Sequence, residues 1–130
     1  MDTPVRPSPE HSASLAARYA RVRARTEWLV RDLTPEDMAA QSMPDASPAK
    51  WHLAHTTWFF ERFVLALDRS HAPLVPWADL YNSYYDAVGP QFPRGQRGVL
   101  TRPRVDEIRA WRAAVDARVV ERLQRGIDAD

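Results

Sequence analysis

The feature that most constrains the fold is an apolar, aromatic stretch, SPAKWHLAHTTWFFERFVLAL, at residues 47–67. Ser47 followed by Pro48 is typical of a helix start, because a serine oxygen can accept from the first free amides and proline suits the first turn. The spacing predicts a helix over about residues 47–68. Its polar residues share one narrow side of the helical wheel, and these are Lys50, Thr57, Glu61 and Asp68. A helix this apolar is packed by neighbours on several sides, so we expect it to be central.

Two histidines, His52 and His55, fall on the apolar side of this helix, so the wheel aims both at the interior. One interpretation is a core histidine whose ring nitrogens meet a carbonyl or hydroxyl, which is the commoner situation for a lone histidine. The other is a metal ligand, because neutral imidazole binds borderline metals well. Histidine pairs that bind a metal from one helix are more often four residues apart than three. The spacing alone therefore favours one ligand at most.

The composition excludes several functional classes. With 130 residues, of which 45% are hydrophobic, the chain is one domain with a real core. A net charge of +1 gives no electrostatic case for binding nucleic acid. The absence of cysteine excludes a disulfide framework and a thiolate zinc site. No apolar run is long enough to cross a membrane and the first residues lack a signal-peptide core, so we expect a cytoplasmic protein without membrane contact.

Two further long helices are predicted. A proline-rich stretch at residues 1–11 indicates a flexible leader, and apolar residues at helical spacing then predict a helix over about 12–31. A third helix is predicted over about 102–125, with Pro103 in its first turn. Its inward stripe contains Arg112, which must either reach water or meet a buried carboxylate, as must Arg62 on the central helix. Three long helices leave apolar surface uncovered, which is typical of a four-helix bundle that lacks one helix.

Residues 70–100 predict a long loop, because prolines at 73, 76, 90 and 93 prevent a long helix. Its aromatic residues predict that the loop packs on the bundle, and we interpret YNSYY, residues 81–85, as an aromatic plug. Later in the loop, Arg94 and Arg97 stand among glycines and a proline, where their planar forks can reach a carboxylate. From the residues alone, ion pairs inside the domain or plain exposure are the better interpretation of these arginines.

Two segments together, SPAKWHLAHTTWFFERFVL and YNSYYDAVGPQFPRGQRGVLTRP, resemble the N-terminal DinB-like domain of the sulfoxide synthases of ergothioneine biosynthesis. The resemblance extends from about Leu33 to the end of the third helix. It implies an all-α DinB-like four-helix bundle. It further implies that the histidine of LAH, His55, is an iron ligand and that His52 only packs. Arg94 and Arg97 would then contact the carboxylates of the thiol substrate, γ-glutamylcysteine or cysteine.

The chain departs from the resembling family in two respects. The family's fourth helix, which carries an HxxxH pair of iron ligands, is missing, as is the domain similar to formylglycine-generating enzymes. Residues 12–130 are therefore expected to be an incomplete DinB-like domain, and His11 and His71 lack the paired spacing to replace the missing ligands. The parent enzymes use Fe(II) and oxygen to join hercynine to a thiol. We expect this chain alone to be inactive and to bind no stoichiometric iron.

The missing elements also predict how the chain associates. We expect an uncovered apolar face that receives the fourth helix or the C-terminal domain from elsewhere, or that drives self-association. Two alternatives to the sulfoxide synthase stay open. One is a metal-dependent thiol transferase of the wider DinB-like group. The other is a non-enzymatic helical interaction subunit or truncated gene product.

Overall fold

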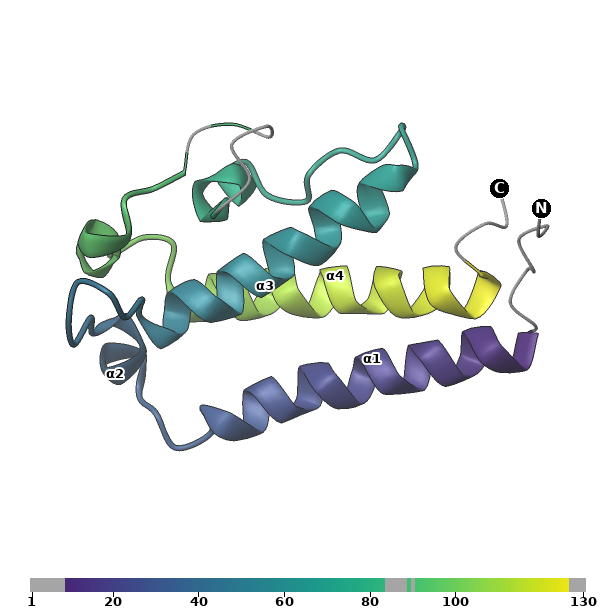
Figure 1. The fold of residues 1–130 in the computed structure, drawn as a ribbon, viewed down its shortest axis with the longest axis horizontal. Coiled ribbons are helices and arrows are strands. Elements are labelled where there is room, and N and C mark those ends of the chain that lie inside the picture. The colour runs from purple at the N-terminus through teal and green to yellow at the C-terminus, as the bar shows by residue number, and fades with distance from the viewer. Residues whose placement is uncertain (1–8, 84–88, 90, 127–130) are drawn as a thin grey trace, which may run out of the picture.

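The computed structural model describes residues 9–83, 89 and 91–126, and over these residues the protein is helical, without strands. The four α-helices are α1 (Pro9–Leu29), α2 (Pro35–Ala39), α3 (Ala49–Phe63) and α4 (Val105–Arg125) (Figure 1). Three short 3-10 helices accompany them: η1 (Leu65–Leu67), η2 (Ala78–Tyr81) and η3 (Arg94–Val99). The predicted all-α class with three long helices is therefore confirmed. None of the described helices has the length and apolar character needed to cross a lipid bilayer.

The three long helices lie roughly side by side, with α4 between α1 and α3 (Figure 1). Helix α3 was expected to be central, and it does contact α2, α4, η1 and η2, but α4 is the helix that packs extensively on both other long helices. The core forms where these helices meet, and its largest fully buried apolar side chains are Met38, Leu53, Trp58, Tyr81, Ile108, Val115 and Val119.

Several helix boundaries differ from the predicted ones. Helix α1 begins at Pro9, so residues 9–11 of the expected leader are helical, and residues 1–8 lie outside the described part of the chain. Helix α3 ends at Phe63 and the chain continues as η1. The predicted serine cap is wrong: the N-cap residue is Pro48, without a side-chain hydrogen bond, while Ser47 Oγ accepts from Arg97 Nη1 at 3.1 Å.

The orientation of α3 differs from the wheel prediction. Three residues of the expected polar side are buried, with Lys50, Thr57 and Glu61 only 5%, 0% and 4% exposed, while Asp68, beyond the end of α3, is exposed as expected. His52, expected inside, is exposed. The reason is that other elements supply hydrogen-bond partners to Lys50, Thr57 and Glu61, which offset the cost of burying these polar groups.

The partners of this buried polar side come from α1, α4 and the loops. Lys50 Nζ donates to the Leu100 carbonyl at 2.7 Å, and Arg23 Nη2 donates to Thr57 Oγ1 at 3.0 Å. Glu61 accepts three hydrogen bonds, whose donors are Trp111 Nε1 at 3.2 Å, the Leu74 amide at 3.0 Å and His71 Nε2 at 3.2 Å. Glu61 therefore connects α3 with α4 and with the start of the long loop.

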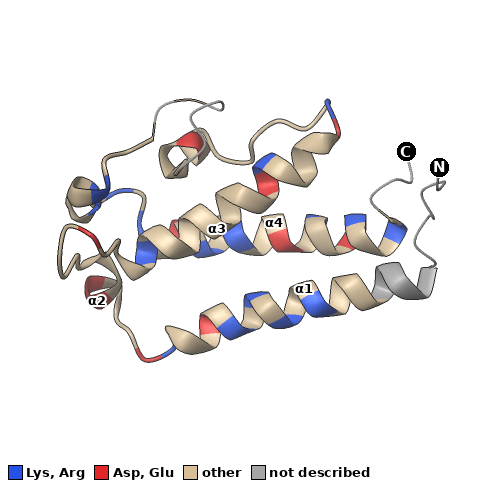
Figure 2. Ribbon diagram, viewed as in Figure 1, with Lys and Arg blue, Asp and Glu red and all other residues tan. Residues whose placement is uncertain are grey.

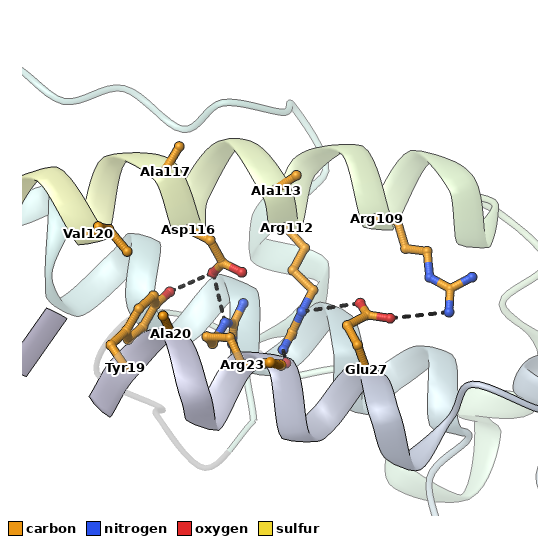
Figure 3. A pocket seen from close by; sticks show the side chains of 11 residues that line it. Tyr19, Ala20, Arg23, Glu27, Arg109, Arg112, Ala113, Asp116, Ala117 and Val120 are labelled. Atoms are coloured by element: carbon orange, nitrogen blue, oxygen red, sulfur yellow. Dashed lines mark hydrogen bonds and ion pairs between the residues drawn. The ribbon is translucent and has the colours of Figure 1, made fainter. Parts of the chain in front are cut away.

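A charged cluster joins α1 to α4, and basic residues recur along both helices (Figure 2). Asp116 Oδ1 accepts from Tyr19 Oη at 2.6 Å and from Arg23 Nε at 2.8 Å (Figure 3). Buried Arg112 meets Glu27, with Nε 3.5 Å from Oε1, but the Glu27 side chain is 39% exposed, so the carboxylate partner is not the buried one that was predicted. Arg62, by contrast, is exposed.

The long loop packs on the bundle as predicted. Trp77 stands edge-on to Trp111 with ring centroids 5.0 Å apart, and Tyr81 lies 5.1 Å from the Trp51 ring. Of the predicted plug, Tyr81 is buried, while Tyr84 and Tyr85 lie outside the described residues. Farther along, Gly98 N donates to Gln41 Oε1 at 2.7 Å. The loop thus returns to the bundle before α4 begins.

Candidate functional site

His55 lies in the second turn of α3 and is half-buried between that helix and the loop. Its Nδ1 atom is 2.7 Å from the backbone carbonyl oxygen of Tyr81. The ring stacks on Trp58, with centroids 5.7 Å apart and planes 19° from parallel. Because a carbonyl can only accept, the neutral ring must carry its proton on Nδ1, which leaves the lone pair on Nε2. This tautomer is the one that a metal-ligating histidine adopts when its other nitrogen is held by a carbonyl.

The surroundings of His55 also favour the neutral ring. Burial is the main effect that lowers its pKa, and the nearby Arg97 guanidinium lowers it further, while the hydrogen bond to Tyr81 acts in the opposite direction. The net result is a pKa below the ordinary histidine value. A metal ligand must be deprotonated at the binding nitrogen, so a lowered pKa suits this role.

Tyr81 holds its carbonyl in place because its own side chain is fixed. It ends η2 and is 1% exposed. Its ring contacts those of Trp51, Trp77 and Trp111, with centroids 5.1, 6.1 and 6.2 Å away. The same short helix is tied to α3 by a hydrogen bond from Trp58 Nε1 to Asp79 Oδ1 at 3.1 Å. The acceptor for His55 therefore belongs to a well-packed segment.

The other histidines do not join His55. His52 is exposed, and its pKa is lowered mainly by partial burial and then by the neighbouring His55 and Arg97. His71 Nε2 instead faces the buried Glu61 carboxylate. The side chain of His11 lies outside the described residues. Within the described ranges, no three histidines or acids gather where they could hold a metal ion together.

Arg97 and Arg94 occupy different environments. Arg97 is 4% exposed, and its guanidinium lies over the Trp51 ring, 3.8 Å from the centroid. It donates to the Phe92 carbonyl and to two hydroxyls, Ser47 Oγ at 3.1 Å and Ser83 Oγ at 3.2 Å. Arg94 is exposed. Arg97 thus secures the loop on the start of α3, and contact of either arginine with substrate stays a prediction.

The sequence did not reveal that Glu61 and Tyr81 support the site. Glu61 was assigned to a polar outer side, although an acid within an aromatic helix was a signal that it could accept from buried donors. Three donors converge on it, one of them the indole of Trp111, which also packs against Tyr81. No side-chain pattern could identify the Tyr81 carbonyl, because every residue type carries one.

His55 should make the stability of the fold depend on pH. An unfolded histidine titrates near about 6.5, and the folded pKa of His55 is lower, so between these values the unfolded chain binds more protons. The free energy of unfolding should therefore fall as the pH drops through about 6.5 towards the folded pKa. His55→Asn, whose amide can still donate to Tyr81, should flatten this slope in urea titrations between pH ~5 and ~7.5. An unchanged slope in His55→Asn would contradict the attribution of this pH dependence to His55. The variant His52→Asn measures how much the neighbouring histidine contributes to the same slope.

Comparison with known proteins agrees with this architecture. Residues 18–130 match the family model described as the DinB superfamily, which covers most of the chain. No curated protein matches the sequence.

Proposed function

Because the chain belongs to the DinB superfamily, we propose that it is a metal-site domain in which His55 supplies one ligand to an iron ion. The observation that carries this proposal is the 2.7 Å contact between His55 Nδ1 and the Tyr81 carbonyl, which orients the ring and leaves Nε2 to a metal. The resemblance of the two motifs supports the finer assignment, a domain of an iron-dependent sulfoxide synthase that joins hercynine to γ-glutamylcysteine or cysteine.

The donor set fits one position of such an iron site. Imidazole nitrogen suits Fe(II), but a useful site needs at least three protein ligands. Since no three histidines or acids gather at one place within the described residues, we propose that an HxxxH helix completes the site, from outside these residues or from another chain. When bound, iron supplies oxygen activation and a binding position for the substrate sulfur.

The role proposed for the described residues is to bind and orient. His55 keeps a neutral nitrogen at a fixed position, and the aromatic rings around Tyr81 maintain the acceptor that holds it. Arg94, exposed on η3, is proposed to bind a carboxylate of the thiol substrate. Arg97 is proposed to contribute positive charge at the same place while its hydrogen bonds shape the loop.

Iron titration in solution tests this proposal. Calorimetry under anaerobic conditions should show no tight iron(II) site in the 130-residue chain alone, because a single imidazole binds weakly. Adding a synthetic amphipathic helix that carries HxxxH should create one site per chain. His55→Ala should weaken that site by at least about 10–100-fold, the range expected for disturbing a metal's protein environment.

His52→Ala is the matched control, because it removes an exposed imidazole three residues away on the same helix. This variant should bind iron like the unmodified chain. Equal binding by the His55→Ala and unmodified chains would refute the proposed ligand. A tight site in the chain alone that His55→Ala abolishes would refute the expectation that this chain binds no stoichiometric iron.

A second candidate function, a helical interaction subunit, is favoured by the exposed apolar side chains. Val22 and Leu29 on α1 are 62% and 61% exposed, and their spacing of seven places them on the same side of the helix. Phe63 at the end of α3 is 36% exposed. Apolar surface of this kind commonly marks a site of association.

Sedimentation measures this surface directly. The chain should self-associate at micromolar concentration, and the paired change Val22→Glu and Leu29→Glu should shift it towards monomer, because burying two carboxylates without partners is unfavourable. Arg21→Glu, which changes an exposed polar position of the same helix, serves as a charge control. A monomeric unmodified chain that melts cooperatively would contradict this candidate.

A further inference from the structure

A pocket lies at the end of the bundle where α2, the start of α3 and the start of α4 meet. It has a volume of about 570 Å³, and its lining does not include His55. Helix α2 contributes Pro35 and Ala39, the segment before α4 contributes Thr101, and α3 contributes Lys50. Lys50 is the single lysine of the whole sequence. The amine-bearing side chain of Lys50 therefore lines a pocket at this end of the bundle.

The environment of Lys50 differs from that of an ordinary surface lysine. The residue is 5% exposed, and its Nζ donates to the Leu100 carbonyl at 2.7 Å. Burial lowers its pKa, and the positive charge of Arg102 lowers it further. Desolvation and a neighbouring cation are the two means by which proteins make a lysine amine nucleophilic near neutral pH.

We propose that Lys50 is a carbonyl-binding amine, which takes a small aldehyde or ketone that carries a carboxylate and holds it as a reversible imine. The neutral Nζ attacks the carbonyl carbon and forms the carbon–nitrogen bond. The carbonyl oxygen then leaves as water with the two hydrogens of the amine, and hydrolysis reverses the step. No oxidation or reduction takes place. This inference is independent of the iron site.

The charged residues around the pocket are the reason to expect a carboxylate on the ligand. Its cationic side chains are Lys50, Arg104 and Arg109, against two acids, Glu36 and Asp106. Arg104 lies 3.2 Å from Asp106, but their side chains are 59% and 73% exposed, and Arg109 is 42% exposed in its pair with Glu27. Exposed ion pairs of this kind are weak, so an incoming carboxylate can compete for the arginines.

Reductive trapping tests the proposal at a single residue. The full chain is incubated at pH 7 with glyoxylate and sodium cyanoborohydride, and the modified amines are quantified by peptide mass spectrometry. Arg21→Lys provides a reference lysine on the exposed side of α1 in the same molecule. Lys50 should be labelled at least ~10-fold faster than this reference, because its neutral fraction is larger. In urea, where the chain is unfolded, the two lysines should be labelled at similar rates.

Two comparisons decide the ligand class. With propanal, which lacks the carboxylate, the ratio of Lys50 labelling to reference-lysine labelling should be smaller than with glyoxylate. The variant Arg104→Gln should lower this ratio for glyoxylate and leave it unchanged for propanal. Equal rate ratios for propanal and glyoxylate would overturn the carboxylate part of the proposal. Labelling of Lys50 at or below the rate of the reference lysine in the folded chain would overturn the proposal as a whole. Lys50→Arg, which keeps a donor for Leu100, must abolish the signal at this position.

Discussion

Replacing Arg112 with alanine should destabilise the fold by about 3–5 kcal/mol, the cost of removing one partner from a buried charged network. Arg112 is 2% exposed and connects all three long helices. Its Nη1 donates to Thr56 Oγ1 at 3.1 Å on α3, its Nη2 donates to the Arg23 carbonyl at 3.3 Å on α1, and its Nε faces Glu27. The free energy of unfolding from urea denaturation measures the loss.

Arg109→Ala is the matched control, because Arg109 also pairs with Glu27, at 3.2 Å, but with a 42% exposed side chain. Its removal should cost no more than about 1 kcal/mol, as for other exposed ion pairs. Arg112→Met separates volume from polarity, since it fills the space but leaves the Arg23 carbonyl without this donor. Similar losses for Arg109→Ala and Arg112→Ala would show that burial does not determine the contribution of this network.

Trp111→Ala should destabilise the fold by about 3–5 kcal/mol, which is typical of deleting a large buried aromatic side chain. Trp111 is 2% exposed, packs against Trp77 and Tyr81, and donates to Glu61 Oε1 at 3.2 Å. Its loss should also loosen residues 74–81 on the bundle, because both aromatic contacts with α4 disappear. Hydrogen exchange of amides in this segment, together with thermal melting, provides the measurement.

Trp28 is the control for this change, since it is 49% exposed and its ring contacts are with Arg25 and Arg31 at the surface. Trp28→Ala should cost about 1 kcal/mol or less, the range for exposed cation–π pairs. Trp111→Phe keeps an aromatic ring but removes one donor to Glu61, so its loss should be intermediate. Unchanged exchange in residues 74–81 of Trp111→Ala would show that other contacts hold the loop.

The sequence predicted the helices better than it predicted their orientation. Aromatic content and helical spacing identified α3, and proline and acidic residues identified the start of α4, because these signals are local. The prediction of which side of α3 faces the core was wrong. Thr57 and Glu61 are buried because they form hydrogen bonds with groups more than ten residues away in the sequence. A wheel treats polar residues as exposed and cannot include donors from α1 or α4.

The candidate site was only partly predictable for a related reason. The motif indicated His55 and not His52, and in the structure His55 is half-buried with its Nδ1 on the Tyr81 carbonyl, whereas His52 is exposed. From the residues alone Arg97 was expected to form an ion pair inside the domain or to face solvent, yet its guanidinium donates to the Phe92 carbonyl and to two serine hydroxyls. Which acceptors surround a loop arginine depends on how the loop folds back, and periodicity carries no information about this.

The hydrogen bond that orients His55 ends on a main-chain oxygen, which has a consequence for mutational studies. No substitution at position 81 deletes that oxygen, so Tyr81→Ala can disturb the acceptor only indirectly, through the aromatic packing that holds it. Replacing the peptide bond between Tyr81 and Asn82 by an ester lowers the acceptor strength of the Tyr81 carbonyl oxygen without altering any side chain. Backbone chemistry of this kind, rather than a survey of variants, can determine how firmly the imidazole is held.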